Sequence, residues 1–276
     1  MNCFARSAAL ALSILAFAIG PVQGATLETG QAREILAEAQ QYFRQANEAR
    51  IADPNGARDL YLRAALRFER IAQDGEIHNG KLYYNTANAY FQSGDIGRAI
   101  LNYRLAERLI PGDINLTQNL AHARQTRVDS FEDRQETKVL KTLLFWHYDL
   151  SPGIRLSILA IFSVLFWAGA ASRLLRKNWA PRWLLAAAAG IALLFLASIS
   201  VESYSSGRET PGVILNEQVV ARKGDADTYE PAFTEPLHAG TEFVLVEDRG
   251  DWVQAELSDG RRCWLPARAV GLVRFQ

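Results

Sequence analysis

The sequence predicts a multidomain protein in which an all-α helical array, a transmembrane helical hairpin and a small all-β barrel follow one another. Small and aromatic residues recur with helical spacing between Gly80 and Asp113, which indicates paired helices. Two long segments without charge follow, at 156–172 and 183–201. Short strands with turn signals then occupy residues 213–276. The 276 residues leave room for about two domains.

The overall charge of the chain predicts no positive electrostatic field that would attract a polyanion. The chain carries 30 basic and 30 acidic residues, so its formal net charge is zero. A nucleic-acid partner is therefore not expected, and there is no acidic excess of the kind that keeps a chain disordered. Any partner-binding site is therefore expected to depend on a local surface feature.

The N-terminus has the pattern of a cleaved secretory signal at residues 1–25. An apolar stretch from Ala8 to Ile19 follows Arg6, and Gly24 and Ala25 supply small residues after Pro21. A helix of that length reaches about 18 Å, too short for a bilayer core of about 30 Å. An uncleaved N-terminal anchor is the alternative.

The segment from Gly80 to Asp113 resembles a 34-residue tetratricopeptide repeat, a helix–turn–helix unit that builds binding scaffolds. Gly94 and Asp95 form the turn between its two helices, and small residues let these helices approach closely. The positions that carry the resemblance are Tyr83, Ala87, Tyr90, Ala99, Tyr103, Ala106 and Pro111.

Partial repeats flank this unit on both sides. Residues 33–51 and 57–72 are predicted helices separated by a turn at 53–56, and residues 113–128 begin a further first helix that caps the stack. About two and a half repeats make a marginal array, because about three are usually needed for stability. We therefore expect contact with a partner or with the membrane-proximal helix at 139–150 to stabilise the array.

First helices line the inner groove of such arrays, and the repeat register places four polar or aromatic residues there. These are Tyr84, Asn88, Gln118 and His122. Their character suits a peptide or a partner helix. In the alternative interpretation, Tyr84 is a packing residue and the other three form a solvated face.

The two charge-free segments, Leu156–Ser172 and Trp183–Val201, are long enough with their flanks to span a bilayer. A buried helical hairpin is the alternative. The loop between them contains four basic residues and no acidic one, and such loops stay in the cytoplasm. Both flanking parts would then lie in the periplasm, outside the bacterial inner membrane. This agrees with the predicted signal.

The C-terminal part resembles a bacterial SH3-like (SH3b) barrel. A predicted hairpin joins DWVQAEL to RRCWLP through Asp259 and Gly260, and alternation puts Val253, Ala255 and Leu257 in the core. Some relatives of this module bind peptidoglycan peptides, which makes Trp252 and Trp264 candidate groove residues. Structural packing is the alternative for both. The insertion at 225–238 departs from the shortest form of the module, and either covers or builds a groove.

We find no constellation that predicts an enzyme, a metal site or a cofactor. The four histidines are scattered, and nucleophile, phosphate-loop and paired-cysteine motifs do not occur. If the signal is cleaved, Cys263 is the remaining cysteine. Its predicted strand position beside a tryptophan favours a buried apolar role over a reactive thiol.

The order of parts resembles the BatE-like proteins of bacterial aerotolerance (Bat) operons. The resemblance implies membrane partners with von Willebrand A-type domains, a MoxR-type ATPase system and a role in envelope stress or aerotolerance. The sequence thus suggests a non-enzymatic inner-membrane scaffold, with a peptidoglycan-binding protein that recruits a cell-wall enzyme as the alternative. A sensor that signals through the hairpin has little support, because the loop is too short for an output domain. The predicted boundaries are 1–25 signal peptide, 31–130 helical repeats, 131–153 membrane-proximal helix, 154–175 first span, 176–182 cytoplasmic loop, 183–201 second span, 202–212 linker and 213–276 SH3b domain.

Overall fold

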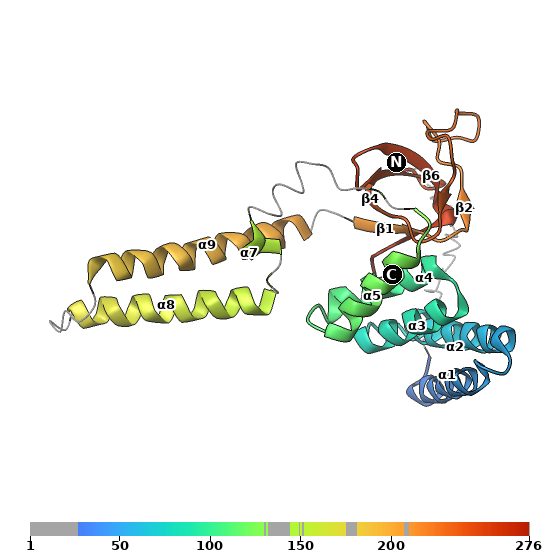
Figure 1. The fold of residues 1–276 in the computed structure, drawn as a ribbon, viewed down its shortest axis with the longest axis horizontal. Coiled ribbons are helices and arrows are strands. Elements are labelled where there is room, and N and C mark those ends of the chain that lie inside the picture. The colour runs from blue at the N-terminus through green and yellow to red at the C-terminus, as the bar shows by residue number, and fades with distance from the viewer. Residues whose placement is uncertain are drawn as a thin grey trace, which may run out of the picture.

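The computed structural model describes residues 27–129, 131, 144–148, 150, 152–174, 181–206 and 210–275. The predicted signal, most of the predicted membrane-proximal helix and residues 176–180 of the predicted loop lie outside the described residues. Figure 1 shows an array of helices packed beside a small β-sheet, with a two-helix hairpin extending away from both. The chain is therefore multidomain, with helical and β parts.

Residues 29–126 form the helical array. Its helices are α1 (Thr29–Ala49), α2 (Pro54–Asp74), α3 (Gly80–Ser93), α4 (Ile96–Leu109) and α5 (Ile114–Thr126). An Asp or Asn side chain accepts a backbone N–H at the start of each helix from α2 to α5, which fixes where these helices begin. The predicted turn at 53–56 is the cap and first turn of α2, because Asp53 caps Gly56 and proline is favourable at the first helical position.

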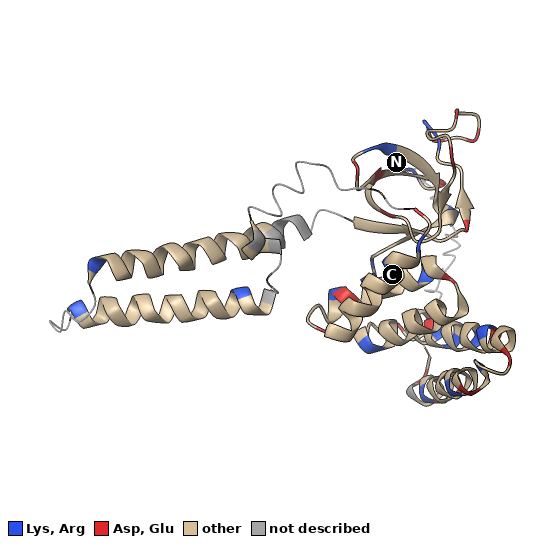
Figure 2. Ribbon diagram, in the orientation of Figure 1, with Lys and Arg blue, Asp and Glu red and all other residues tan. Residues whose placement is uncertain are grey.

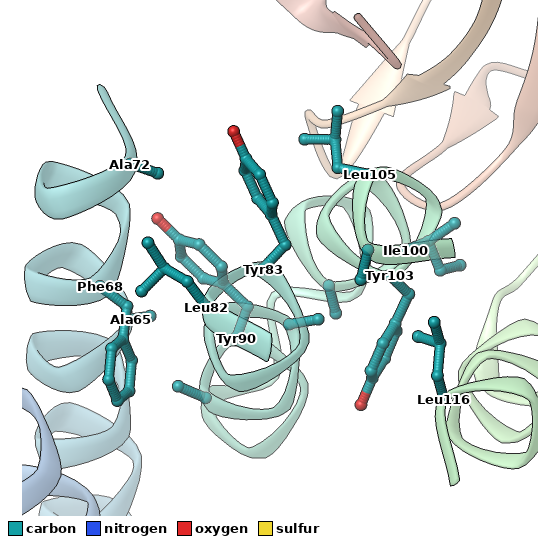
Figure 3. Close-up of a cluster of buried hydrophobic side chains, with 14 of the residues drawn as sticks. Ala65, Phe68, Ala72, Leu82, Tyr83, Tyr90, Ile100, Tyr103, Leu105 and Leu116 are labelled. Atoms are coloured by element: carbon teal, nitrogen blue, oxygen red, sulfur yellow. The ribbon is translucent and has the colours of Figure 1, made fainter. Parts of the chain in front are cut away.

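Alanines and tyrosines alternate in the core of the array. Ala87, Ala99 and Ala106 are completely buried where α3 and α4 meet, as the sequence pattern indicated. Tyr103 of α4 is also buried and lies beside Leu116 of α5 (Figure 3). Gly94 joins α3 to α4 with φ of 95°, a left-handed conformation that glycine adopts without strain.

Two further long helices form the apolar hairpin, α8 (Pro152–Leu174) and α9 (Arg182–Ser206). Both are long and apolar enough to cross a membrane, and most of each apolar stretch is exposed. The Lys and Arg positions of the hairpin lie near its ends (Figure 2). A hydrogen bond of 3.2 Å joins Arg155, near the start of α8, to Ser198, near the end of α9, as expected for antiparallel helices.

The second hairpin helix extends into the predicted linker. The apolar span ends at Val201, as predicted, whereas the helix α9 continues to Ser206. Residues 202–206 contain neither proline nor glycine, so nothing local stops the helix there. A short helix, α7 (Phe145–Tyr148), lies beside the hairpin, where Nδ1 of His147 is 2.8 Å from the Ser198 hydroxyl.

The C-terminal residues form an antiparallel sheet module, which we call the β module (210–275). Its main sheet has the order β6-β5-β4-β1-β7, and β2 pairs with β3 beside it. The strands are β1 (Thr210–Ile214), β2 (Gln218–Val219), β3 (Leu237–His238), β4 (Glu242–Asp248), β5 (Trp252–Leu257), β6 (Arg262–Pro266) and β7 (Val270–Leu272). Asp259 and Gly260 turn the chain between β5 and β6, and the buried set Val253, Ala255 and Leu257 is confirmed.

The β module packs directly on the helical array. Val213 and Val273 belong to the same buried cluster as Ile100 and Tyr103 of α4, so the array core includes side chains from the other end of the chain. The sequence analysis expected support from a partner or the membrane-proximal helix and did not foresee this contact. The residues involved are separated by more than 100 positions, and no local pattern records their pairing.

Candidate functional site

The groove residues predicted on α3 lie in one hydrogen-bonded network. Tyr84 and Asn88 are one helical turn apart, and Asn119 of α5 connects them. Its side-chain amide donates to the Tyr84 hydroxyl and to the Asn88 carbonyl oxygen, each at 3.0 Å. Polar side chains thus join α3 and α5 across the predicted groove. We call this set, together with Tyr103, the groove network.

Tyr103 fixes the orientation of Asn88 from below the surface. Its hydroxyl donates to Asn88 Oδ1 at 2.6 Å, so that oxygen accepts two hydrogen bonds. Burial raises the pKa of Tyr103, which keeps the hydroxyl protonated and able to donate. A side chain held in this way loses less freedom when it binds a partner than a free one does.

The groove residues predicted on α5 are more exposed. Gln118 and His122 lie one turn apart and both face solvent. The His122 ring is 5.3 Å from the ring of Phe91 on α3, so it also bridges the two helices. The structure therefore brings all four predicted residues onto neighbouring parts of α3 and α5, and whether they bind a partner stays a prediction.

A pocket of about 190 Å³ lies between α1, α2 and α3. Its lining residues are Gln40, Phe43, Arg44, Phe68 and Asn85. Neither this pocket nor Asn119 was predicted from the sequence. The available signal was the spacing of 34 residues between Asn85, which lines the pocket, and Asn119, because 34 is the predicted repeat length.

The two tryptophans of the β module lie on one outer face of the sheet. In the β5–β6 register, Trp252 pairs with Pro266 and Gln254 pairs with Trp264, so the indoles are diagonal neighbours. Trp252 is partly exposed, whereas Trp264 has only 7% of its surface exposed. A groove built here would offer mainly Trp252 to a ligand.

The insertion at 225–238 contributes to the cover over Trp264. The Arg249 guanidinium lies 4.6 Å from the centre of the Trp264 ring, a cation–π distance. Asp225 of the insertion bonds the same guanidinium at 2.6 Å, and Glu247 bonds it at 2.8 Å. These acidic partners hold Arg249 over the indole, which supports the packing interpretation of Trp264.

A cluster of charges joins the helical array to the β module, and we call it the joint. Glu242, at the start of β4, accepts hydrogen bonds from Arg124 at 2.7 and 2.8 Å and from Arg127 at 3.3 Å. Arg104 of α4 lies 3.4 Å from the same carboxylate. Burial raises the pKa of Glu242, but the Arg124 hydrogen bonds and the three positive charges outweigh it, so the pKa is lowered.

Asp129 makes a second polar contact in the joint. It lies just after α5 and accepts hydrogen bonds from the backbone N–H of His238 at 2.6 Å and from the Thr241 hydroxyl at 2.7 Å. The His238 ring nitrogen is 2.9 Å from its other oxygen. Burial raises the pKa of Asp129, but these contacts outweigh it and hold the pKa below its usual range.

A cleft of about 1090 Å³ lies beside the joint. Both modules contribute to its walls, with Arg58 and Leu62 from α2, Ile96 from α4 and Asn216 and Glu217 from the β module. Its charged side chains are of both signs. The cleft therefore shows no preference for a ligand of one charge.

The described residues contain no group of three or more His, Cys, Asp or Glu side chains that could hold a metal ion. Cys263 is buried in the β module, and burial raises the pKa of its thiol to about 12. No family model, curated protein or solved structure matches the chain.

Proposed function

We propose that this protein is a non-enzymatic inner-membrane scaffold whose periplasmic modules bind partner proteins of an envelope complex. The observation that carries the proposal is the joint, because Glu242 and its three arginines hold the array and the β module in a fixed relation. The groove network lies on α3, α4 and α5, and the outer face with Trp252 lies on β5 and β6, so the two candidate binding faces belong to different modules. A rigid body with two free faces is suited to holding two partners at once.

The membrane arrangement has two sources of support. The array and the β module touch each other, and the helices of the hairpin between them are antiparallel, so both modules lie on one side of any bilayer that the hairpin crosses. Arg173, near the end of α8, and Arg182, at the start of α9, mark the opposite end of the hairpin. Basic residues at a short loop favour the cytoplasm, which supports a periplasmic location for the two modules.

In this proposal the array is of the tetratricopeptide type and the β module is an SH3b domain. The order of parts then supports a BatE-like protein. The partners implied by that resemblance are membrane proteins with von Willebrand A-type domains and a MoxR-type ATPase system. The proposed role is assembly of an envelope stress or aerotolerance complex.

The test is affinity purification of the full chain from cells after crosslinking, with partners identified by mass spectrometry. Replacing Gln118 and His122 together by alanine should lower capture of the main partner by about tenfold, because both side chains are exposed in the groove. Thr117→Ala is the matched control, since Thr117 is exposed on the edge of α5 away from Asn119. Equal capture by all three proteins would contradict groove binding.

A peptidoglycan-binding role is the second candidate, because Trp252 and Trp264 share an outer face next to an insertion. The full chain in detergent should then sediment with purified peptidoglycan. Trp252→Ala should abolish sedimentation, whereas Tyr229→Ala, an exposed aromatic of the insertion, should not. A wild-type protein that stays in the supernatant would remove this candidate and leave the scaffold proposal.

A further inference from the structure

The β module covers one face of α4 with main chain as well as side chains. Gly97 of α4 is buried against the β1 strand end, where a Cβ atom would lie 2.7 Å from the Ile214 carbonyl oxygen and 2.9 Å from the Leu215 Cα. A Cβ atom at Gly271 of β7 would lie 2.5 Å from the end of the Leu101 side chain of α4, which is flexible and can shift. The approach at Gly97 requires glycine, because the atoms it meets are main chain, so the two modules meet as tightly as parts of one core.

Two valines of the β module complete that core. Val213 and Val273 are fully buried among array residues such as Ile100 and Tyr103. Without the β module, the Ile100 side chain, which lies close to Gly240, would lose part of its cover. Burial of aliphatic side chains stabilises packed helices, so these contacts matter for an array of few helices.

The end of the chain adds a third set of contacts. Arg108 of α4 donates a hydrogen bond to the Val273 carbonyl oxygen at 2.5 Å. The Phe275 ring then lies 5.8 Å from the Tyr83 ring and 4.9 Å from the His78 ring, at the start of α3. The C-terminal residues therefore reach across α4 to α3.

We propose that the β module is a structural cap of the helical array, and that α3, α4 and α5 keep their packed structure only while it is docked. This inference does not depend on what the groove binds. Since the β module follows both helices of the hairpin in the chain, the array core is completed only after the hairpin has brought the β module to the array's side. Under the proposed membrane arrangement, a fully packed array therefore indicates that the hairpin has been inserted with both modules on the same side.

The first test compares two charge reversals on the β module in the full chain, by hydrogen exchange and mass spectrometry. Glu242→Lys places a fourth cation among Arg104, Arg124 and Arg127 and should undock the module. Exchange in α3 to α5 should then accelerate by at least about tenfold, although no array residue has changed. Glu235→Lys, at an exposed position of the same module, should leave exchange unchanged.

The hydrogen-exchange rate of β5, measured in the same experiment, shows whether the β module itself stays folded. Faster exchange in α3 to α5 supports the proposal, whether β5 remains protected or not, because Glu242 lies outside the array. Wild-type protection of α3 to α5 in the Glu242→Lys protein would overturn it.

The second test uses the glycine at the contact. Gly97→Ala improves the intrinsic helix propensity of α4 but pushes the Ile214–Leu215 main chain away. We expect faster exchange in α3 to α5, opposite to what propensity alone predicts. Gly30→Ala, in α1 with open space around it, is the control and should not accelerate exchange. Slower exchange in the Gly97→Ala protein would contradict a capping role.

Discussion

Glu242 and Arg124 form a two-point ion pair between residues 118 positions apart, with nitrogen–oxygen distances of 2.7 and 2.8 Å. The pair joins the first residue of β4 to the last turn of α5, and the Glu242 side chain keeps only 19% of its surface exposed. Between these two residues the chain passes through the whole apolar hairpin. The helical array and the β module are therefore connected twice, once through the hairpin and once through this ion pair.

Acid should weaken the joint. The pKa values of Glu242 and Asp129 are lowered when the modules are docked. A lowered pKa contributes stability that is complete above the ordinary carboxyl range and is lost as the pH falls through the docked value. The melting temperature of the full chain should therefore be steady from pH 7 to 5 and fall below about pH 4.

The Glu242→Gln variant identifies the group responsible for this pH dependence. It should melt at a lower temperature than the wild type at pH 7, and the difference should shrink as the pH falls. Glu235→Gln, which changes an exposed carboxylate of the same module, should melt like the wild type throughout. A constant difference between Glu242→Gln and the wild type from pH 7 to 3.5 would show that the Glu242 charge does not stabilise docking.

The Tyr103 hydroxyl should contribute to the stability of the array and to the shape of the groove. Tyr103→Phe removes one of the two donors to Asn88 Oδ1 and keeps the buried ring. The free energy of unfolding of the array should fall by about 1 kcal/mol, measured by pulse proteolysis in urea. Tyr229→Phe, at an exposed position, is the control. An unchanged value for Tyr103→Phe would mean that water replaces the lost donor.

The sequence predicted the local elements well because their signals are local. Asp259 with Gly260 marks the β5–β6 turn, as predicted, whereas residues 53–56 were predicted as a turn and Pro54 begins α2. Alternation along β5 was enough to assign Val253 to the core. Charge-free length was enough to find the two helices of the hairpin.

Other features depend on which elements meet, and no local pattern contains that information. Gly97 and Val273 look like ordinary helix and strand residues until they are seen in contact with the opposite module. Glu242 looks like a solvated strand end, yet it is surrounded by arginines from α4 and α5. The repeat register placed four groove residues on α3 and α5, but it did not show that Asn119 ties two of them together.

Cys263 should be unreactive in the folded protein. It is buried, and its pKa is raised to about 12, so little thiolate is present at neutral pH. A maleimide at pH 7.5 should label this position slowly in native protein and fully in denaturant, as measured by peptide mass spectrometry. Cys263→Ala assigns the labelled peptide. Rapid stoichiometric labelling of the native chain would reveal an opening of the β module.

The proposed topology predicts opposite results for two reporter fusions. A reporter active only in the periplasm should be active when fused after Gln276 and silent when inserted after Asn178, between the two apolar helices. A cytoplasm-dependent reporter should give the reverse pattern at each position. A silent periplasmic reporter after Gln276, in a fusion that is made and membrane-bound, would refute the periplasmic assignment.

The scaffold account is tested most directly by photocrosslinking from the groove in living cells. A photoreactive amino acid at His122 should form an adduct with a membrane protein that contains a von Willebrand A-type domain, because His122 is exposed beside the groove network. The same amino acid at Thr117, on the other edge of α5, should give much less of that adduct. Adducts only with cell-wall enzymes, or equal adducts from both positions, would contradict the account.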